Sequence, residues 1–458
     1  MAFLWSLMRS CRVPNILRNK WYVKTTLYLP LLGPFPNSFF FRFFLCLIPL
    51  SRSSVLYANV QGYLAWTTCF ADCPEVLVRA LPIVQKDLAS LNESDTCLAL
   101  QAVSCMSSQV LARQLGEEVL KLLISHTSSV PVRKKAACVA LSFYRMEPSF
   151  VDLAEWLDRI APLLEHPQLG VAHCACLLAM ELVRHAPSSF SLFYKHAIDA
   201  LSAILLQNDV RRDYVYHRVP APWLQVQLLA LLRLYPRQPV LDADYKIKLH
   251  DILTFIWKQD VPLAVKADVH EANARYSVQL EAMRLVVHLD ASSPLVSRFT
   301  ASLGQLLTSP ETNVRYLSME IMAHLAQRIP SLSSINLHRD VIFVALGDTD
   351  ISVRRRALDL LYAMCDRTNV RQIVRRLLDY LVVAEPSLRQ DLTLKISILA
   401  ELHTSESSWY IDTTLELLHV AGRHVSNTTW QRILQVVTNH PKVHVLSLIH
   451  ISEPTRLG

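Results

Sequence analysis

A short phrase that recurs at a fixed interval constrains this chain more than any other feature. Each copy has a turn residue, a valine, usually an arginine, and then small or apolar residues spaced by three and four: SVPVRKKAACVAL, PQLGVAHCACLLAM, ETNVRYLSMEIM and DISVRRRALDLL. Val132 and Val171 are 39 positions apart, and so are Val314 and Val353. A weaker copy, SLRQDLTLKISIL, places Leu388 35 positions after Val353. A period near 40 is typical of the HEAT and armadillo class of helix-pair arrays.

The last strong copy carries two apolar stripes rather than one. The first stripe contains Val353, Ala357, Leu360, Leu361 and Met364, and the second contains Leu358, Tyr362 and Cys365. A helix with two apolar stripes lies between neighbours, and a repeat of this kind buries its core only by stacking on the next one. We therefore predict an all-α fold, a right-handed α-solenoid of HEAT/armadillo-like helix pairs from about Gly62 to His440, with no β-sheet.

The glycine content, the net charge and the absence of catalytic motifs exclude several classes of function. The chain has only 8 glycines among 458 residues, and they stand far apart, so no glycine-rich phosphate loop or dinucleotide fingerprint can form. The formal net charge is +7, which is small for a nucleic-acid binder of this length. No Ser-His-Asp, paired-carboxylate or H-E-x-x-H arrangement stands out. We expect no enzymatic activity, no cofactor and no nucleic-acid partner.

The ten cysteines are scattered and form no C-x-x-C pair. They are interpreted as small core residues of a reduced, cytosolic protein. The run His173-Cys174-Ala175-Cys176 is the one hint of a metal site. Neighbouring residues do not share a helix face, and the run lies inside a repeat helix, so core packing is favoured and no metal is expected.

Three consecutive arginines, Arg354 to Arg356, open the last strong copy. They point about 100° apart on a helix and cannot form one flat patch. Arg354 recurs as Arg133 and Arg315, so we predict that these three arginines are structural. Each should meet a carboxylate or carbonyl of the next unit near the start of a second helix, while Arg355 and Arg356 are solvated. Further arginines between 371 and 376 leave anion binding open as the alternative.

Three phrases carry a family resemblance: YVYHRVPAPWLQVQLLALLRLYP at 214–236, LDLLYAMCDRTNV at 358–370 and WYIDTTLELLHVAGRHVSNTTWQRILQVV at 409–437. They resemble alpha adaptin, the large α subunit of the plasma-membrane clathrin adaptor complex. The resemblance implies a scaffold in clathrin-mediated endocytosis and vesicle-mediated intracellular protein transport. It places the chain in the cytosol and in clathrin-coated pits, on the cytoplasmic face of the plasma membrane.

The same resemblance implies the partners. The trunk would pack against a σ and a β-class subunit, cradle the μ subunit and lie on an inositol-phospholipid membrane surface. Clathrin would be reached only through the family's C-terminal hinge and ear, which this sequence lacks. The competing hypothesis is another HEAT-repeat scaffold, of the phosphatase or nuclear-transport type, which copurifying partners would distinguish.

Both ends depart from the family pattern. RNKWYVKTTLYLPLLG at 18–33 aligns with the family's basic headgroup-binding region, with Lys20 and Tyr22 in place and Lys24 one position early. Since Trp21 replaces a lysine, we expect impaired lipid binding. Residues 1–61 are interpreted as an aberrant or incomplete N-terminal segment of the first trunk repeats, in which 34–50 resembles a translated intron. Residues 62–445 are interpreted as the adaptin trunk α-solenoid. Residues 446–458 resemble a translated sequencing adapter and are expected to be disordered.

Overall fold

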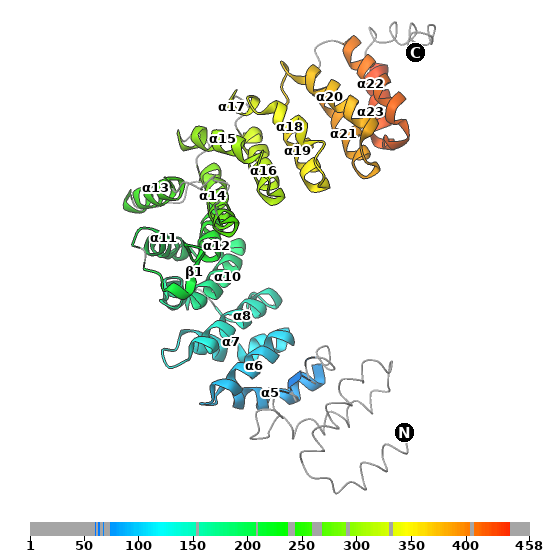
Figure 1. The fold of residues 1–458 in the computed structure, drawn as a ribbon. Helices are drawn as coiled ribbons and strands as arrows, with labels where there is room; N and C mark the ends of the chain where they lie inside the picture. The colour runs from blue at the N-terminus through cyan, green and yellow to red at the C-terminus, as the bar shows by residue number, and fades with distance from the viewer. Residues whose placement is uncertain are drawn as a thin grey trace. The chain divides into compact units, whose positions relative to one another are not determined.

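The computed structural model (Figure 1) describes residues 60, 63, 64, 67 and 74–439, apart from 153–154, 208, 237–242, 259–267, 290–293, 329–332 and 404–406. Contacts between residues divide the chain into two compact units, Met1–Lys258 and Gln259–Gly458. Each unit is described separately. Within the described ranges, no helix is both long enough and apolar enough to cross a membrane.

The first unit is a stack of helix pairs in two layers. One layer contains α6 (Glu93–Cys105), α8 (Val130–Met146), α10 (Leu169–His185) and α12 (Pro222–Arg233), each in contact with the next. The other layer contains α5 (Pro74–Leu88), α7 (Gln109–Ile124), α9 (Leu157–Ile160) continuing as the 3₁₀ helix η2 (Ala161–Glu165), α11 (Leu192–Leu205) and α13 (Ala243–Lys258). Here α5 packs on α7, and α11 packs on η2 and α13.

The second unit repeats this arrangement. Its first layer contains α14 (Val269–Leu289), α16 (Thr312–Arg328), α19 (Ile351–Ala363) and α21 (Pro386–His403), which contact one another in order. Its second layer contains α15 (Pro294–Leu306), α17 (Ser333–Asn336), α18 (Arg339–Ala345), α20 (Val370–Val383) and α22 (Ser407–Ala421); the 3₁₀ helix η4 (Gly422–His424) and α23 (Asn427–Asn439) follow. The prediction of an all-α array of HEAT-like helix pairs is confirmed.

Local sequence explains where the first-layer helices begin and which face they bury. Asp350 caps α19 by accepting a hydrogen bond from the Ser352 backbone N–H at 2.7 Å. The entire first apolar stripe of this helix is buried, as is Leu358 of the second. Tyr362 and Cys365 are only partly buried. The helix is thus sandwiched between neighbours, more completely on one side than on the other.

A small hairpin contradicts the expectation that no sheet forms. Strands β1 (Val215–Tyr216) and β2 (Val219–Pro220) pair antiparallel, joined through His217 and Arg218, whose φ angles of 43° and 68° lie in the left-handed region. The type I′ turn of a two-residue hairpin needs such angles at both central positions, for which Asn-Gly is the usual signal. This sequence lacks that signal. The side chain of Gln225 in α12 instead donates to the Pro220 carbonyl at 2.5 Å and holds the hairpin against the helix.

Candidate functional site

The repeat arginines occupy one equivalent position. Arg133, Arg315 and Arg354 are each the fourth residue of a first-layer helix, in α8, α16 and α19 respectively. In all three cases the guanidinium reaches a side chain in the turn that precedes the next first-layer helix. Each contact therefore joins the first turn of one repeat helix to the start of the next.

The partners of these arginines differ in chemistry. Arg315 donates to the Asp348 carboxylate through Nε at 3.0 Å, with Nη2 at 2.8 Å from the same oxygen. Arg354 Nη2 donates to Glu385 Oε2 at 2.6 Å. Arg133 Nη1 lies 3.0 Å from His166 Nε2, so that repeat uses an imidazole where the others use a carboxylate.

Two of the arginines also hold the turn that precedes their own helix. Arg133 donates to the Ser125 carbonyl from Nε at 2.9 Å and from Nη2 at 2.5 Å. Arg315 Nη1 donates to the carbonyls of Ser309 and Pro310, both at 2.9 Å. Because turn carbonyls are otherwise left without a helical partner, the guanidinium satisfies backbone groups as well as pairing with the next repeat.

Sequence reasoning missed two further members of this set. Arg389 is the fourth residue of α21, and its Nε donates to the Ala384 carbonyl at 2.9 Å. It follows Leu388 as Arg133 follows Val132, so the weak repeat copy already contained the signal. Gln225 is the fourth residue of α12 and donates to Pro220 in the same way. An amide at this position carries no obvious sequence signal.

The arginine triplet divides among three environments. Arg354 pairs with Glu385, and Arg355 is exposed, as expected. The prediction that Arg356 is solvated is wrong: its Nη2 lies 2.8 Å from the Tyr316 hydroxyl and 3.2 Å from Glu320. Its guanidinium also lies 5.0 Å from the centre of the Tyr316 ring. Packing of α16 against α19 brings these partners alongside, and the sequence of α19 alone does not reveal them.

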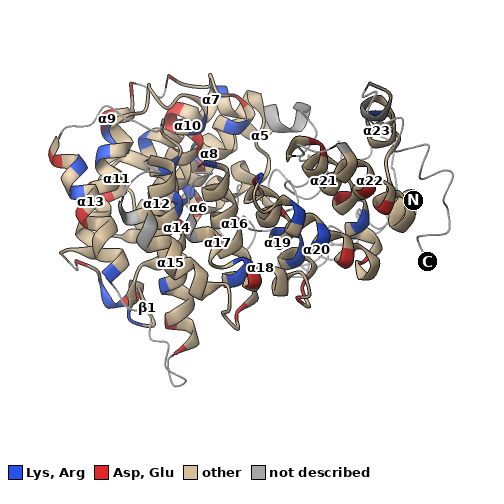
Figure 2. Ribbon diagram, turned by 90° about the horizontal axis from the view of Figure 1, so that it is seen from above, with Lys and Arg blue, Asp and Glu red and all other residues tan. Residues whose placement is uncertain are grey.

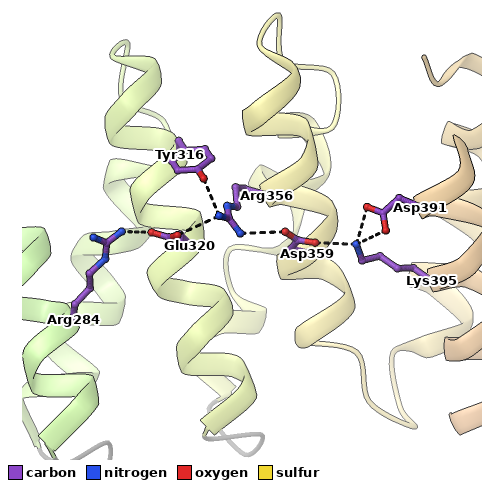
Figure 3. A network of polar contacts seen from close by, with 7 residues as sticks. All are labelled: Arg284, Tyr316, Glu320, Arg356, Asp359, Asp391 and Lys395. Atoms are coloured by element: carbon purple, nitrogen blue, oxygen red, sulfur yellow. Dashed lines mark hydrogen bonds and ion pairs between the residues drawn. The ribbon is translucent and has the colours of Figure 1, made fainter. Parts of the chain in front are cut away.

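Arg356 belongs to a chain of charges that crosses the first layer of the second unit (Figure 3). This polar ladder consists of Arg284, Tyr316, Glu320, Arg356, Asp359, Asp391 and Lys395, from α14, α16, α19 and α21. Glu320 pairs with both Arg284 and Arg356. Arg356 pairs with Asp359 at 3.4 Å, and Lys395 lies 2.9 Å from Asp359. Positive and negative charges therefore alternate along the polar ladder, and α19 and α21 each contribute one of both signs.

The charges of the polar ladder are neutralised within the protein. Burial of Lys395 disfavours its charged form, but hydrogen bonds to Asp391 and Asp359 outweigh that effect and raise the pKa of the lysine. The pairs Arg284–Glu320, Glu320–Arg356 and Asp359–Lys395 are each 36 residues apart. This common offset means that the successive first-layer helices of the second unit pack on one another in the same register.

The arginines of α20 have separate neighbours. Arg375 Nη1 donates to Glu416 at 2.9 Å. Arg371 lies 6.0 Å from the ring centre of Trp409, and Arg376 lies 5.6 Å from that of Phe343. Figure 2 shows basic residues on both α19 and α20. Since these contacts involve both α18 and α22, the three side chains form no single convergent anion cradle.

The six cysteines in the described part of the chain correct another expectation. Only Cys176 is buried, and burial raises its pKa to about 12. Cys105 and Cys138 are exposed, and Cys97, Cys174 and Cys365 are partly exposed. The prediction that cysteines fill the core is therefore wrong for most of them. The described ranges contain no group of three or more potential His, Cys, Asp or Glu metal ligands.

The headgroup candidates Lys20, Tyr22 and Lys24 lie outside the described residues.

The helices α21 and α23 expose apolar side chains. On α21, Leu394, Ile398 and Leu402 are spaced by four and are 45%, 38% and 65% exposed. On α23, Trp430 and Leu434 are also exposed. These side chains supply apolar surface of the kind used in protein–protein contacts.

Comparisons with known proteins place this geometry in context. The family described as "Adaptin N terminal region" matches residues 19–455. The chain is 36% identical over 438 residues to AP-2 complex subunit alpha-1 of Arabidopsis thaliana, covering 94% of this chain and 42% of that protein. It is 35% identical over 393 residues to AP-2 complex subunit alpha-2 of Dictyostelium discoideum, covering 85% and 39%. The chain thus spans less than half the length of these relatives.

Solved structures agree on the fold. A chain in a homology model of the full-length AP-3 complex matches with a TM-score of 0.55 at 18% identity, covering 95% of this chain and 75% of that one. Yeast importin-beta (Kap95p) matches with a TM-score of 0.59 at 13% identity, covering 92% and 53%. At these identities the likeness concerns the helical array alone.

Proposed function

Because this chain belongs to the adaptin N-terminal region family, we propose that it is a clathrin adaptor subunit of the α type, acting as a scaffold in endocytosis and vesicle-mediated protein transport. The observation that supports this proposal most strongly is the sequence identity to AP-2 α subunits along most of this chain. We assign the trunk to residues 62–445. The role is to hold other subunits in place, without catalysis. Importin-beta shares the fold at low identity, which gives the nuclear-transport alternative no comparable support.

The proposed partners are the β, μ and σ subunits of an adaptor complex. The proposed location is the cytosol and the cytoplasmic face of the plasma membrane in clathrin-coated pits. The polar ladder supports this reading because its charges are satisfied internally, so the repeats hold one another in register without a ligand. Exposed apolar residues of α21 and α23 supply surface for broad apolar contact rather than a ligand pocket.

Co-expression tests the assignment. The tagged chain is produced with a σ-type small subunit and a β-class large subunit, and the purified material is analysed by size exclusion and mass spectrometry. We expect both subunits to copurify in a stoichiometric complex. A matched co-expression with importin-alpha and Ran serves as the control for the nuclear-transport alternative. A folded, soluble chain that copurifies with neither adaptor subunit contradicts the proposal.

A second part of the proposal concerns the membrane. Lys20, Tyr22 and Lys24 are proposed to contact an inositol-phospholipid headgroup weakly, because exposed lysines near an anionic surface contribute about 1 kcal/mol each and are screened by salt. We expect feeble sedimentation with bisphosphate-inositol liposomes, reduced by Lys20→Ala with Lys24→Ala and by added salt. Arg375→Ala with Arg376→Ala on α20 is the matched control. Binding that is lost in the control but kept in the lysine variant would move the site to α20.

A further inference from the structure

Two cysteines face each other across consecutive repeats of the first unit. Cys138 lies on α8 and Cys174 on α10, helices that are in direct contact. The register follows from neighbouring contacts with the same offset of 36 residues. Arg145 of α8 pairs with Glu181 of α10 at 2.9 Å, seven residues beyond each cysteine. The two cysteines are therefore opposite each other by the same register that makes this ion pair.

A contact on the other side of the cysteines fixes the same register independently. Four residues before Cys138 and Cys174 stand Lys134 and Gly170. A Cβ at Gly170 would lie 3.2 Å from Cδ of Lys134, so the lysine stem passes directly over the glycine. The cysteine pair thus lies between two points at which α8 and α10 touch at one offset.

The two thiols interact and differ in character. The neighbouring Cys174 thiol is the main reason that the pKa of Cys138 falls to about 7. Lys135 lowers it further, while burial opposes the shift. The same interaction between the two thiols raises the pKa of Cys174. Cys138 is exposed, so its thiolate is accessible, and Cys174 is positioned as the proton donor beside it.

We propose that Cys138 and Cys174 form an oxidant-sensitive pair that closes a reversible disulfide between consecutive repeats when the chain meets a peroxide. The Cys138 thiolate attacks one peroxide oxygen, the O–O bond breaks, and the leaving hydroxide takes a proton to become water. Cys138 is then a sulfenic acid. The Cys174 sulfur attacks the Cys138 sulfur, the S–O bond breaks, and hydroxide leaves as water with the Cys174 proton.

The overall step converts two thiols and one hydrogen peroxide into one disulfide and two waters. A dithiol reductant reverses it by thiol–disulfide exchange and is itself oxidised to a disulfide. The bond links α8 to α10, so it restricts the sliding of one repeat on the next. Because a crosslink removes conformations from the unfolded chain, the oxidised protein should also be more stable than the reduced protein.

The test is peroxide titration of the purified chain. After treatment, remaining thiols are alkylated and the protein is peptide-mapped without reduction. We expect a peptide linked through Cys138 and Cys174, an intact mass lower by two hydrogens, and a Tm that rises on oxidation and returns after dithiothreitol. Cys105→Ser is the matched control, because Cys105 is also exposed and lies on the neighbouring first-layer helix α6. It should leave the link and the Tm shift unchanged.

Cys174→Ser separates the two steps. In this variant Cys138 should still be oxidised and trapped by dimedone as a sulfenic acid, but the link and the Tm shift should disappear. If that variant does not fold, as judged by circular dichroism, Cys138→Ser at the exposed position takes its place and should abolish the link. The proposal is overturned if both cysteines remain alkylatable once Cys105 is oxidised. Linkage of either cysteine to a different cysteine overturns it as well.

Discussion

In α8 and α16 the arginine at the fourth helical position contacts both the turn before its own helix and the turn before the next one. Arg315 neutralises Asp348 in the next turn and hydrogen-bonds to the carbonyls of Ser309 and Pro310 in the turn before it. Its side chain is only 16% exposed and that of Asp348 only 11%. Solvent therefore replaces these contacts poorly when the guanidinium is removed.

Arg315→Ala should lower the free energy of unfolding by about 2 kcal/mol, because a partly buried carboxylate and two turn carbonyls lose their donor. The measurement is urea unfolding followed by circular dichroism. Arg355→Ala is the matched control, since Arg355 is exposed on the same layer, and it should change stability by less than about 0.5 kcal/mol. Equal losses in the two variants would mean that the turn contacts are not structural.

Gly116 of α7 is a second residue whose role depends on a close neighbour. An added Cβ would lie 2.4 and 2.8 Å from two ring carbons of the buried Phe150. Gly116→Ala should therefore be destabilising, because overpacking costs about 1–3 kcal/mol and outweighs the helix propensity gained, about 1 kcal/mol at most. Thermal unfolding measures the change. Gly422→Ala, where an added Cβ meets no described atom within 4 Å, should not lower the Tm.

At the level of whole elements, a carboxylate in the turn before α20 orders the backbone that leads into the helix. Asp366 accepts hydrogen bonds from the backbone N–H groups of Thr368 and Asn369, at 2.7 and 2.9 Å, in the turn before α20. Burial disfavours the Asp366 carboxylate, but hydrogen bonds from Thr368 and Asn369 outweigh this effect and lower its pKa. The turn between α19 and α20 is therefore most stable when Asp366 is ionised.

Asp366→Ala should lower the free energy of unfolding by about 1 kcal/mol at neutral pH, because the Thr368 and Asn369 N–H groups lose their acceptor. A carboxyl with a lower pKa in the folded state stabilises it above the unfolded pKa and loses that effect as pH falls through the folded pKa. The difference between the wild type and the variant should thus shrink below about pH 4. Urea midpoints measured from neutral to acidic pH check this, with the exposed Asp379→Ala as control. A difference that is constant with pH would contradict this role of the Asp366 carboxylate.

On the scale of the whole molecule, stability comes from each repeat packing on its neighbours. In such arrays the effect of a core substitution spreads chiefly to adjacent repeats. Leu361 of α19 is fully buried, and α19 packs against α16 and α21. A substitution at Leu361 should therefore reduce the stability of the second unit.

Leu361→Ala should destabilise the second unit by about 2–5 kcal/mol, through lost burial and a residual cavity. Hydrogen exchange read by mass spectrometry should show faster exchange in α16, α19 and α21, and unchanged exchange in α8 and α10. The control is Leu182→Ala in α10, also buried, which should give the reverse pattern. Uniform acceleration in both variants would show that the chain unfolds as one cooperative block.

The sequence by itself determined the architecture. The 39-residue spacing and the two apolar stripes of the helix that begins at Ile351 can be read directly from the order of residues along the chain. They predicted stacked helix pairs, and the family phrases identified the class of array. The repeat also predicted that Arg133, Arg315 and Arg354 are equivalent, because equivalent positions in stacked units have equivalent surroundings.

Tertiary structure alone decided which side chains meet. Arg356 pairs with Glu320, and Cys138 opposes Cys174, because the packed helices bring residues 36 positions apart together at one particular register. That register depends on how α16 fits α19 and α8 fits α10, which neither helix encodes alone. The hairpin at His217 and Arg218 likewise could not be predicted from the sequence. Packing against α12 supports a backbone conformation there that the local residues do not favour.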